Sequence, residues 1–344
     1  MMSDQQSSWN SSNLMKACVT GGTGYMASLL IKCLLQKGYT VNTTARDPDN
    51  LEKITHLLEL GNLGELKIFR ADLTDEGSFQ EAVTGCDIVF HIATPVHFAS
   101  EDPENDMIKP AIQGTLDVLK SCVKAKTVKR VIMTSSAAAV SINKLKGTDL
   151  VMNEECWTDV DFLYAEKPPT WGYPVSKTVA EKAAWEFAEE NNIDLITVIP
   201  SLMAGPSLTP NVPSSICLAM SLLTGNELLI NGLKGMQVLS GSISITHVED
   251  VVRAHIFLAE KQSASGRYIC CAVNTSVPEL AMFLNKQYPQ YEVPTNFGDF
   301  PASQAKLILS SMKLIEEGFS FKYGVKDIYD ESIEYFKNVG LLQK

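Results

Sequence analysis

Short apolar runs alternate with amphipathic stretches up to Pro200. Six runs have the length and the β-branched character of buried strands, at 16–20, 40–44, 66–69, 87–92, 128–133 and 194–199. Between them, apolar residues recur at helical spacing in five segments, at 24–37, 51–60, 77–84, 105–126 and 173–191. Apolar strands that alternate with helices are typical of a parallel sheet covered on both faces. The pattern predicts an α/β fold with a doubly wound sheet of Rossmann type.

The pattern changes after Pro200. Proline-rich loops lead to a helical segment at 214–223, a glycine-rich stretch at 225–241 and a helical segment at 248–260. Amphipathic segments at 279–284 and 329–336 follow. We expect residues 14–200 to form the Rossmann-type domain and residues 201–344 mainly a smaller substrate lobe, interleaved with the end of the sheet. The polar residues 1–13 predict a disordered tail.

Composition narrows the possible partners. With 344 residues, 45% of them hydrophobic and 20% charged, the chain is long enough for a full core without metal or disulfide staples. The net charge of −11 disfavours nucleic acid and anionic membranes as partners. The uncharged stretch 195–226 is broken by four prolines, so we expect no membrane span. We therefore expect a small-molecule substrate; the oligomeric state stays open.

Cysteine and histidine spacing adds two expectations. The eight cysteines contain no C-x-x-C pair, so we expect them to be reduced and to pack in the core. No leader of secretory or transit type is visible, and we therefore expect the protein in the cytosol. No histidine has the spacing of a metal site, so we expect no metal.

A glycine-rich turn joins the first strand to the first helix. Gly21, Gly22 and Gly24 lie in the segment Thr-Gly-Gly-Thr-Gly-Tyr-Met-Ala, with Ala27 at its end. In this position Gly21 permits a tight turn, and Gly24 lets the backbone approach a pyrophosphate at the positive end of the helix. The sequence therefore predicts a dinucleotide site.

The end of the second strand indicates which dinucleotide binds. A site for NAD carries an acidic residue about twenty positions after the turn, but here the stretch ends in Arg46. Arg46, with Lys53 in the next helix, could hold a 2′-phosphate, which favours NADP(H). Asp47 is the alternative, as a ribose-binding carboxylate shifted along the chain. Asp72 has the place of an adenine contact or of a helix N-cap.

A tyrosine and a lysine share one helix face. Tyr173 and Lys177 are four residues apart, and Thr134-Ser135-Ser136 ends the fifth strand, where parallel sheets meet their ligands. A lysine ammonium at ~4 Å could stabilise phenolate by as much as about 4 kcal/mol, lowering the phenol pKa by roughly three units. Tyr173 could then transfer a proton near neutral pH while Ser136 holds the substrate oxygen.

Together these motifs resemble the extended short-chain dehydrogenase/reductase family. Longer phrases at 46–48, 69–75, 91–98, 168–177 and 266–271 are similar to the plant flavonoid reductases, and most of all to those that reduce anthocyanidins to flavan-3-ols with NADPH. The resemblance implies that Ser136, Tyr173 and Lys177 form the catalytic group. It also implies a set of cofactor-binding residues, which comprises Gly21, Gly24, Tyr25, Arg46, Lys53, Asp72, Leu73, Ala93, Thr94, Tyr173, Lys177 and Pro200.

Four alternatives remain. In dihydroflavonol 4-reductases we would expect Asn and Gln where this chain has Ser141 and Ser244, and cinnamoyl-CoA reductases carry a different phrase at 169–173. A related NADPH-dependent carbonyl reductase is a further possibility. A non-catalytic NADP-sensing regulator would normally lose one of Ser136, Tyr173 and Lys177, and all three are present.

Overall fold

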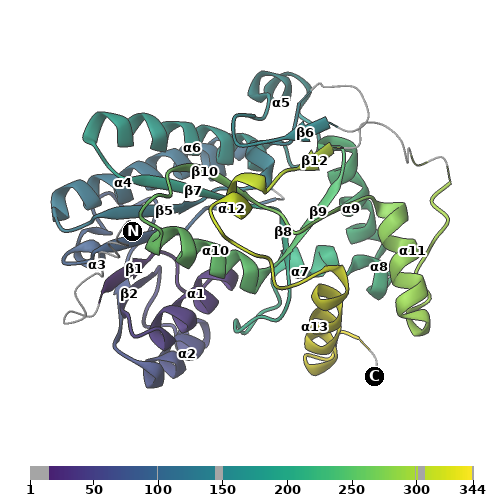
Figure 1. Cartoon of the computed structure of the whole chain (residues 1–344), viewed down its shortest axis with the longest axis horizontal. Coiled ribbons are helices and arrows are strands. Elements are labelled where there is room, and N and C mark those ends of the chain that lie inside the picture. The colour runs from purple at the N-terminus through teal and green to yellow at the C-terminus, as the bar shows by residue number, and fades with distance from the viewer. Residues whose placement is uncertain (1–14, 99, 144–149, 299, 301–306, 343–344) are drawn as a thin grey trace, which may run out of the picture.

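A seven-stranded parallel sheet, in the order β3-β2-β1-β4-β5-β7-β10, runs through one half of the molecule (Figure 1). Its strands are β1 (Lys16–Val19), β2 (Thr40–Ala45), β3 (Leu66–Arg70), β4 (Ile88–His91), β5 (Arg130–Thr134), β7 (Leu195–Pro200) and β10 (Gly266–Cys270). Chain order reverses between β1 and β4, and parallel sheets bind ligands beyond the carboxyl ends of such strands. The predicted α/β class is confirmed, and β10 is an additional strand.

The computed structural model describes residues 15–98, 100–143, 150–298, 300 and 307–342. The tail predicted at 1–13 lies outside these residues. Within them, no helix is long and apolar enough to cross a membrane.

Helices cover both faces of the sheet because strand side chains alternate in direction. Ala17 and Val19 pack with α1 (Tyr25–Gln36), α2 (Leu51–Leu60) and α10 (Val248–Glu260). Cys18, between them, joins the opposite core, which α3 (Gln80–Val83), α4 (Lys109–Ala125) and α6 (Gly172–Asn191) cover. The helix predicted at 105–126 begins as a π-helical turn, η2 (Glu104–Ile108). Short 3-10 turns are η1 (Gly61–Leu63), η3 (Ala137–Ala139) and η4 (Pro289–Tyr291).

The second half of the chain builds a lobe beside this sheet. A three-stranded sheet of β8 (Leu202–Ala204), β9 (Ile243–His247) and β11 (Val273–Thr275) packs with several helices. These are α7 (Ser214–Ala219), α8 (Ser221–Thr224), α9 (Glu227–Ser240), α11 (Val277–Gln287) and α13 (Val325–Asn338). The glycine-rich stretch is helix α9, which we did not predict. Asn226 caps it, and Ile230 and Leu233 reach the lobe core, so packing outweighs the low helix propensity of glycine.

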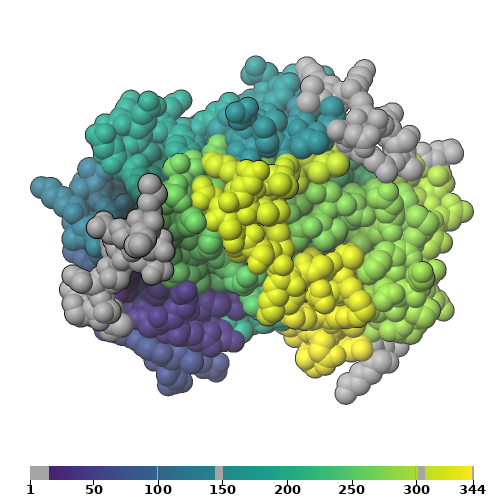
Figure 2. Space-filling model, in the orientation of Figure 1, coloured from purple at the N-terminus to yellow at the C-terminus, as the bar shows by residue number. Residues whose placement is uncertain are grey.

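The last part of the chain bridges the two halves. Strand β12 (Leu307–Leu309) pairs with β6 (Leu150–Met152), next to α5 (Val160–Glu166). Helix α12 (Met312–Glu316) packs on the core of the large sheet and α13 on that of the lobe, and this C-terminal segment, yellow in Figure 2, runs across the near face of the molecule. The domain boundary near residue 200 stays a prediction, since α10 and β10 return to the first half.

Candidate active site

The glycine turn after β1 lies directly against the end of β4. Gly21 has a φ of +69°, and a Cβ there would lie 3.1 Å from Ala93 Cα. A Cβ on Gly22 would lie 2.1 Å from Thr43 Oγ1, so only glycine fits between β1 and β2. Gly24 is exposed at the N-cap of α1, and no described side chain caps this helix. Its first N–H groups are therefore available to an anionic group, as pyrophosphate binding requires. The importance of Gly22 escaped sequence analysis.

A buried polar chain secures this crevice. Thr20 Oγ1 accepts hydrogen bonds from the backbone N–H groups of Ile92 and Ala93, both at 3.0 Å. Its own proton then points to His91 Nδ1, at 3.1 Å, so the other ring nitrogen, Nε2, donates to Thr115 Oγ1, also at 3.1 Å. Burial, with the nearby charge of Lys177, lowers the pKa of His91 to about 3. His91, at the end of β4, is therefore a neutral ring that links the end of β1 to α4.

Two arginines lie at the end of β2 and β3. Arg70 pairs with Asp47 at 3.4 Å and with Asp49 at 2.7 Å, and its Nη1 donates to the Arg46 carbonyl oxygen. The Arg46 side chain is exposed and has no ion pair among the described residues. Lys53 is exposed in the first turn of α2. The carboxylate that could have bound a ribose is thus already paired, whereas Arg46 is available.

The loop after β3 carries two predicted cofactor contacts. Asp72 Oδ1 accepts bonds from the Thr74 N–H at 2.9 Å and the Thr74 hydroxyl at 2.7 Å. Burial raises the pKa of Asp72, but these bonds and the charge of Arg46 outweigh it, so the pKa is lowered. Leu73 packs on α4, where a Cβ on Gly114 would lie 2.6 Å from it. Asp72 therefore stabilises a local turn rather than a helix N-terminus, and lies near Arg46.

Ser136, Tyr173 and Lys177 converge beyond the end of β5. Lys177 is buried on α6, and its Nζ donates to the Thr134 carbonyl oxygen at 3.3 Å. Burial lowers the pKa of Lys177 to about 8, and Glu181 partly offsets this. Burial raises the pKa of Tyr173, and a hydrogen bond with Ser136 lowers it in part. The direction of this shift is opposite to our prediction, because burial of the phenol outweighs the effect of Ser136.

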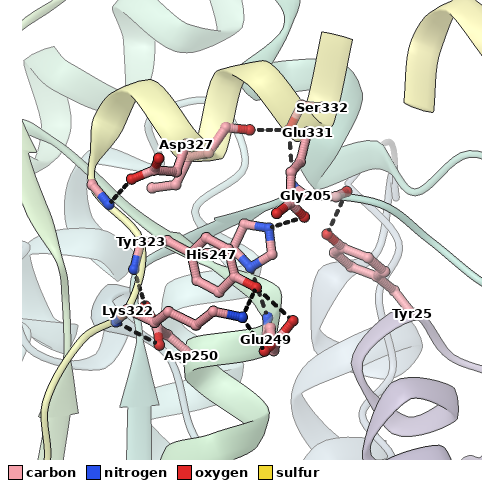
Figure 3. A network of polar contacts seen from close by, with 12 residues as sticks. Tyr25, Gly205, His247, Glu249, Asp250, Lys322, Tyr323, Asp327, Glu331 and Ser332 are labelled. Atoms are coloured by element: carbon pink, nitrogen blue, oxygen red, sulfur yellow. Dashed lines mark hydrogen bonds and ion pairs between the residues drawn. The ribbon is translucent and has the colours of Figure 1, made fainter. Parts of the chain in front are cut away.

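Phe98 lies beside Tyr173, and the remaining predicted cofactor contacts are Thr94, Pro200 and Tyr25. Phe98 is exposed, with its ring 5.1 Å from the Tyr173 ring. Thr94 follows Ala93 in the loop after β4, and buried Pro200 ends β7 opposite Cys270. Tyr25 has another partner: its phenol donates to the Gly205 carbonyl oxygen at 2.9 Å, which links α1 to the lobe (Figure 3).

The sheet order, the uncapped glycine turn and the Ser-Tyr-Lys group define a Rossmann-type oxidoreductase of the short-chain class. The chain belongs to the NAD dependent epimerase/dehydratase family, whose model matches residues 17–271. The resemblance to the extended short-chain reductases is thereby confirmed.

Relatives and solved structures extend this comparison. The chain is 75% identical to an anthocyanidin reductase ((2S)-flavan-3-ol-forming) of Vitis vinifera, over 95% of this chain and 96% of the relative. It is 46% identical to a dihydroflavonol 4-reductase of Dianthus caryophyllus, over 94% and 88%. Alfalfa vestitone reductase superposes with a TM-score of 0.79 at 39% identity, over 95% and 99%. Yeast methylglyoxal/isovaleraldehyde reductase Gre2, complexed with NADPH, gives 0.80 at 27% identity, over 95% and 100%.

Proposed function

We propose that this protein reduces an anthocyanidin, such as cyanidin, to a flavan-3-ol, such as epicatechin, with NADPH. The observation that carries the reaction type is the convergence of Ser136, Tyr173 and Lys177 beyond β5, on the same edge of the sheet as the glycine turn. The substrate class is supported by 75% identity to an anthocyanidin reductase over nearly the whole chain.

The described residues fit NADPH. Gly21 and Gly24 bring backbone to the uncapped start of α1, which suits a pyrophosphate. Arg46 and Lys53 are exposed cations for the 2′-phosphate. We assign the remaining cofactor contacts to the surrounding loops, with Tyr25 as a support of the turn through Gly205; the loop contacts are Asp72, Leu73, Ala93, Thr94 and Pro200.

The chemistry needs only one proton from the protein. Two molecules of NADPH, bound one after the other, would supply the two hydrides that turn a flavylium cation into a flavan-3-ol. The product also contains one proton beyond these hydrides, and Tyr173 is the side chain that we assign to deliver it. Lys177 stabilises the phenolate that remains, and Ser136 holds a substrate oxygen beside the phenol.

Dihydroflavonol reduction is the second candidate, because the Dianthus relative is 46% identical. Reduction of a ketone creates an alkoxide that needs several hydrogen-bond donors. Ser141 and Ser244 are both buried, and Ser244 donates to Asn274 Oδ1 at 2.9 Å. Because the Ser244 hydroxyl already donates to Asn274, it does not donate to an alkoxide. This favours a flavylium substrate, which is electron-poor before it binds and needs fewer donors.

The test is to incubate the purified protein with NADPH and either cyanidin or dihydroquercetin, and to separate the products on a chiral column. We expect flavan-3-ols from cyanidin and little leucocyanidin from dihydroquercetin. Robust leucocyanidin formation without catechin or epicatechin would assign the second candidate instead.

We also propose that the protein works in the cytosol with reduced cysteines. All eight cysteines are free thiols, and five of them are buried. A thiol-specific reagent should therefore titrate eight thiols in the denatured protein without prior reduction; fewer would contradict this proposal.

A further inference from the structure

Consecutive residues at the end of β5 each contact one residue of α6. The Thr134 carbonyl oxygen accepts a hydrogen bond from Lys177, and Ser136 acts on the Tyr173 phenol, whose pKa it lowers. Tyr173 and Lys177 are one helical turn apart, and so they lie on the face of α6 that meets the strand end. Ser135, which lies between Thr134 and Ser136, points to the next turn of α6.

That next turn carries Glu181, which is fully buried. The Ser135 hydroxyl donates to Glu181 Oε2, and the Thr197 hydroxyl donates to Oε1 at 2.9 Å. Arg267 on β10 completes the set, with Nε 2.8 Å from Oε1 and Nη2 3.4 Å from Oε2. Both carboxylate oxygens are therefore hydrogen-bonded, and the charge of Glu181 is paired with that of Arg267.

Arg267 is itself firmly held. Its Nη1 donates to the carbonyl oxygens of Glu154 and Cys156, at 2.5 and 2.9 Å, and its guanidinium lies 3.6 Å from the centre of the Trp157 ring. The buried ion pair between Glu181 and Arg267 thus joins α6, β10 and the loop before α5.

We propose that Glu181, held in place by Arg267, is a positioning residue that keeps Lys177 charged and aligned beside Tyr173. This inference rests on the proposed reductase function. Glu181 acts through the lysine. Lys177 lies one turn before it on α6, with its Nζ bonded to the Thr134 carbonyl oxygen, and the carboxylate charge raises the pKa of Lys177.

Two buried histidines near Lys177 carry no charge. Burial lowers the pKa of His91 to about 3 and that of His255 to about 4, so both rings are neutral near pH 7. The groups that face this region are Tyr173 and Glu181 on α6, His91 on β4, His255 on α10, bonded to Thr134, Arg267 on β10, and Glu154 in the loop before α5. Glu181, one turn from Lys177 on α6, is therefore the carboxylate whose charge acts on the lysine.

The experiment compares the full-length wild type with E181Q, which keeps the shape of the side chain and removes its charge. E189Q makes the same change at an exposed position of α6 and is the matched control. The charge of Lys177 is followed without substrate, from the pH dependence of lysine 13Cε NMR signals, with K177R to assign the resonance. Steady-state kcat with NADPH and cyanidin is then measured between pH 6 and pH 8.

We expect the titration midpoint of Lys177 in E181Q to fall by roughly one pH unit, with E189Q unchanged. From a midpoint of about 8, this predicts kcat roughly fivefold lower at pH 8 and within about twofold of wild type at pH 6. A purely structural defect would lower kcat equally at both values. An unchanged midpoint in folded E181Q would overturn the proposal.

E181Q leaves Arg267 buried and unpaired, which could prevent folding. The double variant E181Q/R267Q removes both charges and avoids this problem. We expect its Lys177 midpoint to remain below that of wild type, and equality with wild type would overturn the proposal. Because the NMR titration needs no substrate, a wild type that does not convert cyanidin would refute the proposed function and leave the role of Glu181 to be judged separately.

Discussion

The molecule contains two polar networks that use similar residues in different surroundings. Behind the catalytic group, Glu181 is fully buried and the Arg267 side chain is 9% exposed. Where the lobe meets the sheet, His247 is buried, but its neighbours Glu249 and Glu331 are 35% and 43% exposed (Figure 3). Charges in the first network are unscreened and can control a proton, whereas water weakens those in the second.

The second network is accordingly built around a ring stack. The His247 ring lies on Tyr323 with centroids 3.8 Å apart and planes at 21°. Its Nδ1 accepts from the Glu249 N–H at 3.1 Å, so in the neutral ring Nε2 carries the proton and faces Glu331, 3.2 Å away. These contacts attach the segment before α13 to the start of α10. We therefore expect the first network to affect turnover and the second to affect stability.

Tyr173→Phe gives the largest expected effect and tests the catalytic group in front of the first network. Loss of the phenol should lower kcat roughly 10²- to 10⁴-fold while NADPH binding persists, because the ring remains but the proton donor is gone. Stopped-flow reduction and NADPH fluorescence titration measure the two quantities. A loss below tenfold would show that Tyr173 only positions the substrate.

Arg46→Ala tests whether the exposed charge of Arg46 affects only the binding of NADPH. Loss of charge-assisted hydrogen bonds to a phosphate, worth about 1.5–3 kcal/mol, should raise the KM for NADPH roughly 10- to 150-fold. The KM for NADH, which lacks the phosphate, serves as the control and should hardly change. Equal increases in KM for NADPH and NADH would show that Arg46 does not bind the 2′-phosphate, and would favour Asp47 as a ribose contact instead.

His247→Asn tests the lobe junction. Asparagine can keep the acceptor for the Glu249 N–H but loses the stack on Tyr323, so we expect a loss of about 1–3 kcal/mol in unfolding free energy at pH 7.5. The kcat of the folded variant should stay near that of wild type. Urea unfolding measures the stability, with exposed His97→Asn as the control.

The same variant should change the response to acid. Burial lowers the pKa of His247 to about 4. Between pH ~6.5 and 4 the unfolded chain then binds a proton that the folded chain does not, so stability falls as the pH falls through this window. Removing the histidine should make stability less dependent on pH there. A steeper dependence in the variant would contradict a neutral His247 in the fold.

Tyr25→Phe gives the smallest expected effect, at the contact that joins the two regions. Loss of the hydrogen bond to the Gly205 carbonyl should cost about 0.5–1.5 kcal/mol of stability. If Tyr25 only supports the turn, the KM for NADPH should change less than twofold. A larger change would place the phenol in the cofactor site, as the family resemblance implied.

Local patterns in the sequence determined the class of fold and much of the candidate site. The strand and helix periods predicted six of the seven parallel strands, because each buried strand carries its own apolar run. The glycine turn and the Tyr173–Lys177 spacing were also visible, because a turn and a helix face are made by neighbouring residues.

Only the tertiary structure decided what these groups contact. Gly22 matters because of Thr43 on another strand, and Glu181 meets Arg267 across 86 positions of sequence. The pKa of Tyr173 was predicted in the wrong direction, since helical spacing shows a lysine nearby but not how deeply the phenol is buried. Burial and long-range pairing depend on how distant segments pack, and in a dry interior they outweigh the local spacing that a sequence displays.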